Sequence, residues 1–229
     1  MNIVVTGASR GIGHGLVEEF IKSGHNVIAV SRNTTPLKAL AKKTSHGKLI
    51  VSGIDLEHPK APDEIAQSVG ENFNQLDILI NNAGLLINKP FQSLESDDFD
   101  RMFKVNVKAP FNTVRTLSDY FAPGAHIVNI GSMGGYQGSA KFPGLSLYSA
   151  SKGALAILTE CLAEELKPMS IKVNCLALGA AQTEMLGEAF PGYKAPVTAG
   201  EMASYIAWFA LNGHNFFNGK ILPVSVSTP

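Results

Sequence analysis

The feature that most constrains the fold of this chain is an alternation that runs almost from end to end. Short apolar runs rich in β-branched residues are separated by longer segments with helical periodicity. This alternation is typical of βαβ units wound around a parallel sheet. We therefore expect an α/β fold with a doubly wound, seven-stranded parallel sheet and helices on both faces, giving three layers. The expected strands are residues 3–6, 27–31, 48–53, 77–81, 126–131, 172–178 and 220–224.

Nothing in the sequence would divide the chain into separate units. Its 229 residues contain no internal repeat, low-complexity tract or Pro/Ser-rich linker. A hydrophobic fraction of 45% with 17% charged residues is ordinary for a globular protein. Because α/β folds commonly reach this length as one unit, we expect a single domain over residues 1–229.

Charge and cysteine usage narrow the possible partners. The 19 basic and 19 acidic residues cancel without a basic cluster, so we expect no nucleic acid partner. The apolar runs are too short to cross a bilayer, and residues 1–6 enter a strand without the basic start of a signal peptide. Two distant cysteines fit a reducing compartment, and six scattered histidines suggest no metal site. We therefore expect a cytoplasmic protein with a small-molecule partner and no membrane association.

A glycine-rich segment follows the first expected strand. Residues 6–13 read Thr-Gly-Ala-Ser-Arg-Gly-Ile-Gly and lead into a helical pattern. Glycine allows a tight turn and close backbone approach, and a helix N-terminus presents unpaired N–H groups to a pyrophosphate. We interpret the segment as a dinucleotide-binding loop. Its spacing differs from the general Gly-x-Gly-x-x-Gly fingerprint, so a plain Gly-rich turn is the alternative.

Further motifs follow in order along the chain. Residues 81–84 read Asn-Asn-Ala-Gly, Asn106 lies in a helical segment, Ser132 follows the fifth strand, and residues 148–152 read Tyr-Ser-Ala-Ser-Lys. With the glycine-rich loop, this set resembles the classical short-chain dehydrogenase/reductase family over almost the whole chain. The resemblance implies a Rossmann-like fold that binds a nicotinamide cofactor. It also implies an oxidoreductase that acts on a carbonyl or alcohol substrate.

Tyr148 and Lys152 are four residues apart, so they share one face if their segment is helical. Hydride transfer to a carbonyl builds alkoxide charge on oxygen, which needs a nearby acid. Free tyrosine, with a pKa of about 10, is a reluctant donor. We expect the Lys152 ammonium and the positive nicotinamide of an oxidised cofactor to lower the pKa of Tyr148.

The resemblance implies roles for two further catalytic candidates. Ser132 would hydrogen-bond the substrate oxygen, and Asn106 would hold a water in a proton relay behind Lys152. Lys152 would also bind the nicotinamide ribose. The alternatives are an ordinary loop hydroxyl for Ser132 and a helix-perturbing amide for Asn106.

Cofactor preference is indicated after the second expected strand. Where NAD-preferring members of the family carry an acid, this chain has Ser31 and Arg32. A guanidinium can bind a 2′-phosphate through two hydrogen bonds, and Arg10 offers a second cation. The resemblance therefore implies NADP(H) as the preferred cofactor, with NAD(H) possible. The alternative is that both arginines are only solvated.

The residues expected at the cofactor come from the glycine-rich loop, the ends of later strands and the catalytic helix. Asp55 would contact adenine, although an ordinary turn-forming Asp fits nearly as well. Thr183 would contact the nicotinamide carboxamide. The full set is Gly7, Ser9, Arg10, Gly11, Ile12, Gly13, Ser31, Arg32, Asp55, Leu56, Asn82, Ala83, Gly84, Tyr148, Lys152, Gly179, Ala181 and Thr183.

Two segments depart from the family pattern. Ser132 and Tyr148 are a few residues further apart than usual, so we expect a bulge at 138–144; without it, Ser139 could replace Ser132. The expected substrate lid, residues 184–197, is short. Either the pocket is open or a neighbouring subunit completes it. An apolar helix side with Ile157 and Cys161 could meet another subunit, as in a homodimer or homotetramer.

Three functions are compatible with these residues. The leading hypothesis is an NADP(H)-dependent carbonyl reductase or alcohol dehydrogenase. A non-catalytic NADP(H)-binding sensor or partner-binding protein on the same scaffold is the second, because a fold does not determine function. The third is an NAD-linked dehydrogenase, which Arg32 disfavours.

Overall fold

The central sheet has the seven strands expected from the sequence, and they run parallel as expected. A computed structural model describes residues 1–43 and 46–226. All seven strands are parallel and lie in the order β3-β2-β1-β4-β5-β6-β9. The strands are β1 (Asn2–Thr6), β2 (Asn26–Val30), β3 (Leu49–Ser52), β4 (Leu76–Asn81), β5 (Phe121–Ser132), β6 (Lys172–Leu178) and β9 (Ile221–Val224).

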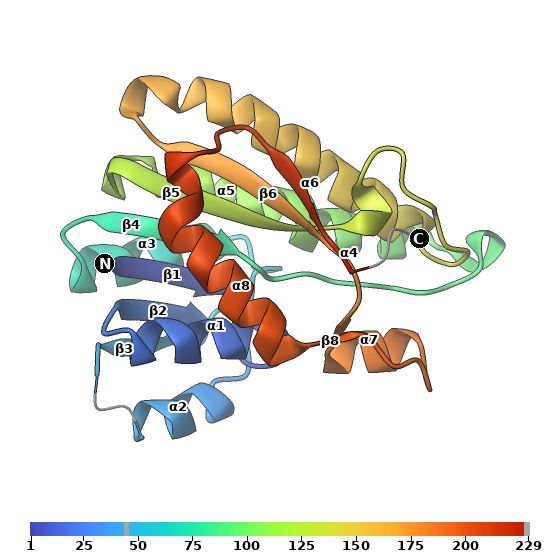
Figure 1. Cartoon of the computed structure of the whole chain (residues 1–229), viewed down its shortest axis with the longest axis horizontal. Coiled ribbons are helices and arrows are strands. Elements are labelled where there is room, and N and C mark those ends of the chain that lie inside the picture. Colours follow the sequence, from blue (N-terminus) through green and yellow to red (C-terminus); the bar gives the residue numbers. More distant parts are fainter. Residues whose placement is uncertain (44–45, 227–229) are drawn as a thin grey trace.

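Helices cover both faces of this sheet, so the expected three layers are confirmed (Figure 1). Residues of α1, α2 and α8 pack on one face, and residues of α3, α5 and α6 pack on the other. The bounds are α1 (Gly11–Lys22), α2 (Thr35–Ala41), α3 (Ala61–Asn72), α4 (Ser96–Phe103), α5 (Ala109–Thr116), α6 (Ser146–Glu165), α7 (Glu184–Ala189) and α8 (Ala199–Asn212).

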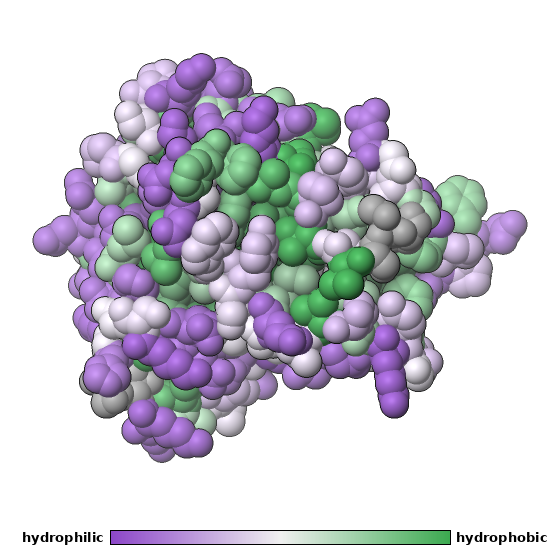
Figure 2. All heavy atoms as spheres, in the orientation of Figure 1, coloured by the Kyte–Doolittle hydropathy of each residue, from purple (hydrophilic) through white to green (hydrophobic). Residues whose placement is uncertain are grey.

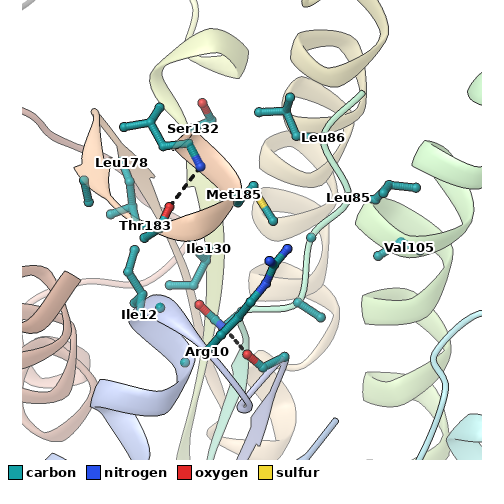
Figure 3. Close-up of a pocket in the computed structure, with 18 of the residues that line it drawn as sticks. Arg10, Ile12, Leu85, Leu86, Val105, Ile130, Ser132, Leu178, Thr183 and Met185 are labelled. Carbon is teal, nitrogen blue, oxygen red and sulfur yellow. Dashed lines mark hydrogen bonds between the residues drawn. The ribbon is translucent and has the colours of Figure 1, made fainter. Parts of the chain in front are cut away.

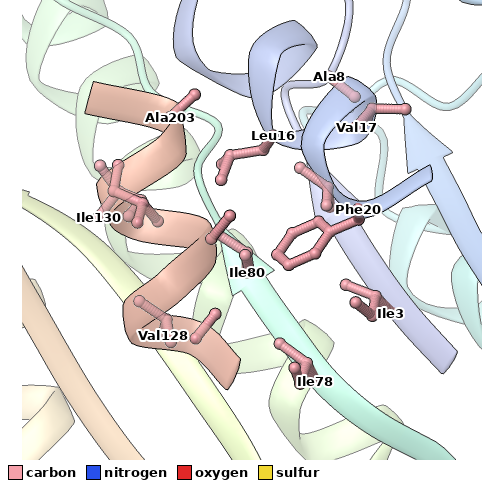
Figure 4. Packing of buried hydrophobic residues seen from close by; sticks show 14 of the residues in the cluster. Ile3, Ala8, Leu16, Val17, Phe20, Ile78, Ile80, Val128, Ile130 and Ala203 are labelled. Atoms are coloured by element: carbon pink, nitrogen blue, oxygen red, sulfur yellow. The ribbon is translucent and has the colours of Figure 1, made fainter. Parts of the chain in front are cut away.

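Burial on both faces explains why the strands are continuous apolar runs rather than alternating ones. In β1, Ile3 and Val5 belong to the core under α1 and α8, whereas Val4 belongs to the core on the opposite face. All three side chains are fully buried. Figure 4 shows Phe20 of α1 between the helices and the sheet, close to Ile3.

The order of the strands reverses beside β1. The chain runs from β1 to β2 and β3 in one direction, then returns to β4 and continues in the other. Open α/β sheets bind ligands in the crevice outside the carboxyl ends of the strands at such a switch point. In Figure 1 α7 lies on the right, the side toward which β1 points. The fold therefore places α7 near the expected binding crevice.

Some local elements differ from the expectation. β5 begins at Phe121 rather than 126, with a register shift between Leu76 and Ile78 of its neighbour. A second, two-stranded sheet joins β7 (Ala181–Gln182) to β8 (Val197–Thr198) at the base of the lid segment. A π-helical turn, Lys104–Lys108, links α4 to α5.

The outer surface carries an apolar region on the face shown in Figure 2. Hydrophobic residues gather there over the part of the molecule where α8 and β9 lie, within a mostly hydrophilic surround. Tyr205 and Trp208 of α8 are exposed. Within residues 1–43 and 46–226, every helix is too short or too polar to cross a membrane.

Candidate active site

The glycine-rich loop packs tightly against the end of β4. Gly7 and Gly11 have positive φ angles of 67° and 53°. A Cβ on Gly13 would overlap the carbonyl oxygen of Gly7, and one on Gly7 would lie 2.7 Å from Cα of Ala83. Asn82 Nδ2 fixes this approach by donating to the carbonyl oxygens of Thr6 (2.9 Å) and Gly7 (3.1 Å). The loop is followed at once by the N-terminus of the 12-residue α1.

Such a loop fits a dinucleotide. Its glycines leave room for a pyrophosphate to approach the backbone, and the α1 N-terminus offers unpaired N–H groups and the positive end of the helix dipole. The loop and the ends of β2 and β3 line one cleft of about 910 Å³. The cleft is large enough for a cofactor and a small substrate together.

Both arginines expected at the 2′-phosphate line this cleft, and each forms an ion pair with an acid. Arg32 Nη1 lies 3.5 Å from Oε1 of Glu57. Arg10 pairs with Glu188 of α7, with Nη2 3.3 Å from Oε2. The hydrogen bond to Glu188 raises the pKa of Arg10. Neither guanidinium is therefore only solvated.

Asp55 and Thr183 also line the cleft, but each already has a structural role. Asp55 Oδ1 accepts a hydrogen bond from the Glu57 N–H (3.0 Å), so the turn-forming reading of Asp55 holds alongside its place in the cleft. Thr183 is the N-cap of α7 and accepts from the Leu186 N–H (3.2 Å).

Three of the four catalytic candidates meet at the carboxyl end of β5. Ser132 is the last residue of β5, and Tyr148 and Lys152 lie in the first turns of α6. The side chains of Ser132 and Tyr148 are hydrogen-bonded. Lys152 is 3% exposed, and its Nζ donates to the Ile130 carbonyl (2.7 Å), 5.9 Å from the centre of the Tyr148 ring.

In the protein alone, the pKa of Tyr148 lies above its ordinary value. Burial raises it to about 12, and the hydrogen bond with Ser132 opposes this only in part. The Lys152 ammonium donates to the Ile130 carbonyl. Burial in turn lowers the pKa of Lys152 to about 8. In the protein alone, Tyr148 is therefore a protonated acid at neutral pH.

Asn106 lies in the π-helical turn and does not line the cleft. Its Nδ2 donates to the Leu85 carbonyl (2.9 Å) and to Ser151 Oγ (2.9 Å). Its Oδ1 accepts from the Leu85 N–H (2.8 Å). These bonds tie the turn to α6 and to the segment after β4. Both the nitrogen and the oxygen of the Asn106 amide are therefore bonded to protein groups.

The segment between Ser132 and Tyr148 bulges as expected. Gly138 and Gly144 have positive φ angles of 82° and 83°. Ser139 Oγ donates to the carbonyl oxygens of Met133 and Tyr136. The Ser139 hydroxyl is thus turned into its own loop, and Ser132 rather than Ser139 lines the cleft.

The cleft collects every predicted site residue except Asn106. Those that line it are Gly7, Ser9, Arg10, Gly11, Ile12, Gly13, Ser31, Arg32, Asp55, Leu56, Asn82, Ala83, Gly84, Ser132, Tyr148, Lys152, Gly179, Ala181 and Thr183. Figure 3 shows Arg10 and Ile12 on one side of this space and Leu85, Leu86 and Val105 on another.

The sequence did not point to three residues that shape the cleft. Glu57 and Glu188 pair with the two arginines, and Asn88 bonds the end of α7. Their signals are weak because acids and amides are common on surfaces, and each acts on a distant segment.

Comparisons with known proteins agree with this geometry. Residues 1–194 match the short chain dehydrogenase family, and this chain belongs to it. Carbonyl reductase [NADPH] 2 of Sus scrofa is 34% identical over 178 residues, which cover 76% of this chain and 69% of the relative.

Solved structures show the same fold. A short chain dehydrogenase from Burkholderia cenocepacia in complex with NADP has a TM-score of 0.89 at 28% identity, covering 99% of this chain and 96% of its own. A 4-hydroxyisoleucine dehydrogenase complexed with NADH has a TM-score of 0.84 at 28% identity, covering 98% and 96%. The chain is therefore an oxidoreductase scaffold for a nicotinamide cofactor.

Proposed function

We propose that this protein transfers a hydride between NADP(H) and a carbonyl or alcohol substrate, as a carbonyl reductase does. The observation that supports this most is the hydrogen-bonded pair Ser132 and Tyr148, which faces the same cleft as the glycine-rich loop. A cofactor sensor has no need of two hydroxyls at the place where a substrate oxygen would lie.

Each side chain has a distinct role in the proposed reaction. The bound nicotinamide would supply the hydride. Ser132, whose Oγ accepts from the Gly134 N–H (3.1 Å), would donate to the substrate oxygen and hold it beside Tyr148. Tyr148 would give its phenolic proton to that oxygen as negative charge builds. The Lys152 ammonium would stabilise the tyrosinate left behind.

The preference for NADP(H) is supported by Arg32 and Arg10. Both line the cleft, at the end of β2 and in the glycine-rich loop. A 2′-phosphate carries more negative charge than one carboxylate, so it would compete with Glu57 and Glu188 for the two guanidinium groups. The porcine relative and the Burkholderia complex, both named with this cofactor, add support.

The experiment that tests this function is a comparison of Tyr148→Phe with the wild type. Loss of the general acid should lower turnover of a ketone by NADPH by roughly a hundredfold or more. NADPH oxidation is followed by absorbance, and NADPH binding by fluorescence titration. Binding should be kept, because the phenol hydroxyl supplies little of the cofactor contact.

Two results would contradict the proposal. Near-normal turnover in Tyr148→Phe would remove Tyr148 from its role. Tight NADPH binding by the wild type, without turnover of any carbonyl in a broad panel, would favour the sensor.

A further inference from the structure

The substrate half of the cleft lies beyond Ser132 and Tyr148, and its walls are mainly apolar side chains. Three segments build it: the residues after β4, the loop before α6, and α7 with the turn that follows. The side chains that they contribute are Leu86, Phe142, Leu145, Met185, Phe190 and Tyr193. In Figure 3 Leu86 and Met185 come from different segments and both point into the drawn space.

The charged side chains that line the cleft lie at its other end or are turned away. Arg10, Arg32 and Glu57 belong to the ends of β1, β2 and β3, and the two arginines are ion-paired. Glu184 lies against the glycine-rich loop, where its Oε2 would be 3.4 Å from a Cβ on Gly11. Lys152 is buried on the Ile130 carbonyl.

Two lysines in the neighbouring segments, Lys141 and Lys89, are also occupied. Lys141 Nζ donates to the carbonyl oxygens of Tyr136 (2.8 Å) and Ser139 (3.0 Å). Lys89 Nζ forms an ion pair with Asp98 (2.7 Å). Among the described residues that line this half of the cleft, a carboxylate or phosphate on the substrate would therefore meet no unpaired cation, and burying such a charge unpaired is very costly.

Two polar side chains next to these walls, Asn88 and Ser139, are likewise satisfied within the protein. Asn88 Nδ2 donates to the Ala189 carbonyl (2.9 Å), and the Ser139 hydroxyl donates into its own loop. A polyhydroxylated substrate would lose hydrogen bonds to water and gain few in return. By contrast, Phe142 and Tyr193 are about half exposed, and an apolar substrate would cover them.

We propose that the substrate is an uncharged ketone, or the matching secondary alcohol, whose carbon skeleton is hydrocarbon rather than acidic or polyhydroxylated. This inference rests on the proposed function and names the class of molecule that the reaction uses. The reacting oxygen is the one polar group that the walls are built to receive.

The test compares two ketones of nearly equal shape. 6-Methyl-2-heptanone and 5-oxohexanoate have the same methyl ketone and spacer, and differ by an isopropyl group in place of a carboxylate. With NADPH and the wild-type protein, we expect kcat/KM to favour the uncharged ketone by on the order of 100-fold or more. L-Erythrulose, a polyhydroxylated ketone, should be as poor as the keto acid.

A variant adds a cation to the wall. Met185→Lys should shift the ratio of the two kcat/KM values toward 5-oxohexanoate by about tenfold or more, because an ammonium would pair with its carboxylate. Met169→Lys is the matched control: Met169 is exposed and outside the cleft, so its ratio should equal that of the wild type.

The outcomes separate the two proposals. Equal or better turnover of 5-oxohexanoate or L-erythrulose by the wild type would overturn the substrate class and leave the proposed function standing. NADPH binding without turnover of any of the three compounds would overturn the proposed function, and this inference with it. The wild-type ratio decides the question even if Met185→Lys fails to fold.

Discussion

Of the two groups at this site, Lys152 is the one that changes its charge near neutral pH, whereas Tyr148 does not. Burial lowers the pKa of Lys152 to about 8 and raises that of Tyr148 to about 12. Below about pH 8 the ammonium is present and can stabilise a tyrosinate; above it the charge is lost while Tyr148 stays protonated. The proposed reduction should therefore depend on the protonation of Lys152.

We expect kcat/KM for ketone reduction to be flat near neutral pH and to fall above about pH 8, approaching tenfold per pH unit. Initial rates of NADPH oxidation from about pH 6 to 10 measure it. In Lys152→Arg the falling limb should disappear from this range, because a guanidinium stays protonated. If kcat/KM of Lys152→Arg still falls above about pH 8, the fall is due to the titration of another group.

Arg32 and Glu57 together should control the choice of cofactor. Glu57 Oε1 lies 3.5 Å from Arg32, and Glu57 Oε2 lies 3.7 Å from Nε of Arg101. Glu57 would compete with the 2′-phosphate of NADP(H) for Arg32. Arg32→Ala should weaken NADPH binding by roughly tenfold, and Glu57→Gln should strengthen it by about threefold, since exposed pairs are weak.

Fluorescence titration with NADPH and NADH measures both effects. NADH, which lacks the 2′-phosphate, is the internal control and should change little in Arg32→Ala. If NADPH and NADH affinities fall together in Arg32→Ala, the guanidinium is not the phosphate contact.

At the scale of elements, α7 is held over the cleft by a few long-range bonds. It has six residues, none of them buried. Arg10 of the glycine-rich loop binds Glu188, and Asn88 Nδ2 binds the Ala189 carbonyl. The backbone N–H of Lys89, the residue after Asn88, donates to the Gly144 carbonyl (3.2 Å). This bond joins the segment after β4 to the bulged loop before α6. The short lid thus has anchors at both halves of the cleft.

Removing the anchor on the substrate side should loosen the lid. Asn88→Ala should raise KM for a ketone by about fivefold, the effect of one lost hydrogen bond, with NADPH affinity unchanged. Steady-state kinetics measures this. Asn212→Ala is a matched control, because its Nδ2 donates to the Trp208 carbonyl (2.8 Å) on α8. Equal KM values in the two variants would show that Asn88 does not position the lid.

The elements also show which parts of the structure a sequence can predict. The sheet strands are predictable because each apolar run is buried on both faces, as Ile3, Val4 and Val5 are. The pairing of β7 with β8 is not, because two-residue strands have no periodicity and form where tertiary contacts bring them together.

The same distinction applies to the site. The spacing of Tyr148 and Lys152 predicted their shared helix face, since that relation is local. The pair of Arg10 with Glu188 joins residues 178 apart and leaves no local pattern. The raised pKa of Tyr148 in the protein alone could not be predicted from the sequence, because burial is a property of the folded molecule.

At the scale of the whole molecule, a buried histidine joins β5, β6 and α8. His126 is 1% exposed, and its Nδ1 lies 2.9 Å from the Ala210 carbonyl. Its Nε2 lies 3.0 Å from Asn174 Nδ2. The Asn174 amide is fixed by the Phe217 carbonyl (3.0 Å) and the Lys220 N–H (3.1 Å), so it must present N–H groups to the ring. His126 is therefore neutral, donating from Nδ1 and accepting at Nε2.

Protonation of His126 at Nε2 would place its N–H against the N–H of Asn174 Nδ2, so that two donors would face each other. Burial lowers its pKa from 6.5 to about 4, and the neighbouring His214, whose ring centre is 5.5 Å away, acts in the same direction. Below about pH 6.5 His126 binds a proton in the unfolded chain but stays neutral in the folded protein. The free energy of unfolding therefore decreases as the pH is lowered to about 4. Between about pH 7.5 and 5 this amounts to roughly 2 kcal/mol in the free energy of unfolding.

Urea unfolding at these two pH values measures the loss. His126→Gln should be less stable than the wild type at pH 7.5 but should lose about 2 kcal/mol less on going to pH 5, because the titrating group is gone. His58→Gln, at an exposed position, should keep the wild-type loss. An equal loss in His126→Gln and His58→Gln would show that acid acts elsewhere, since the buried His126 ring must be neutral to join β5, β6 and α8.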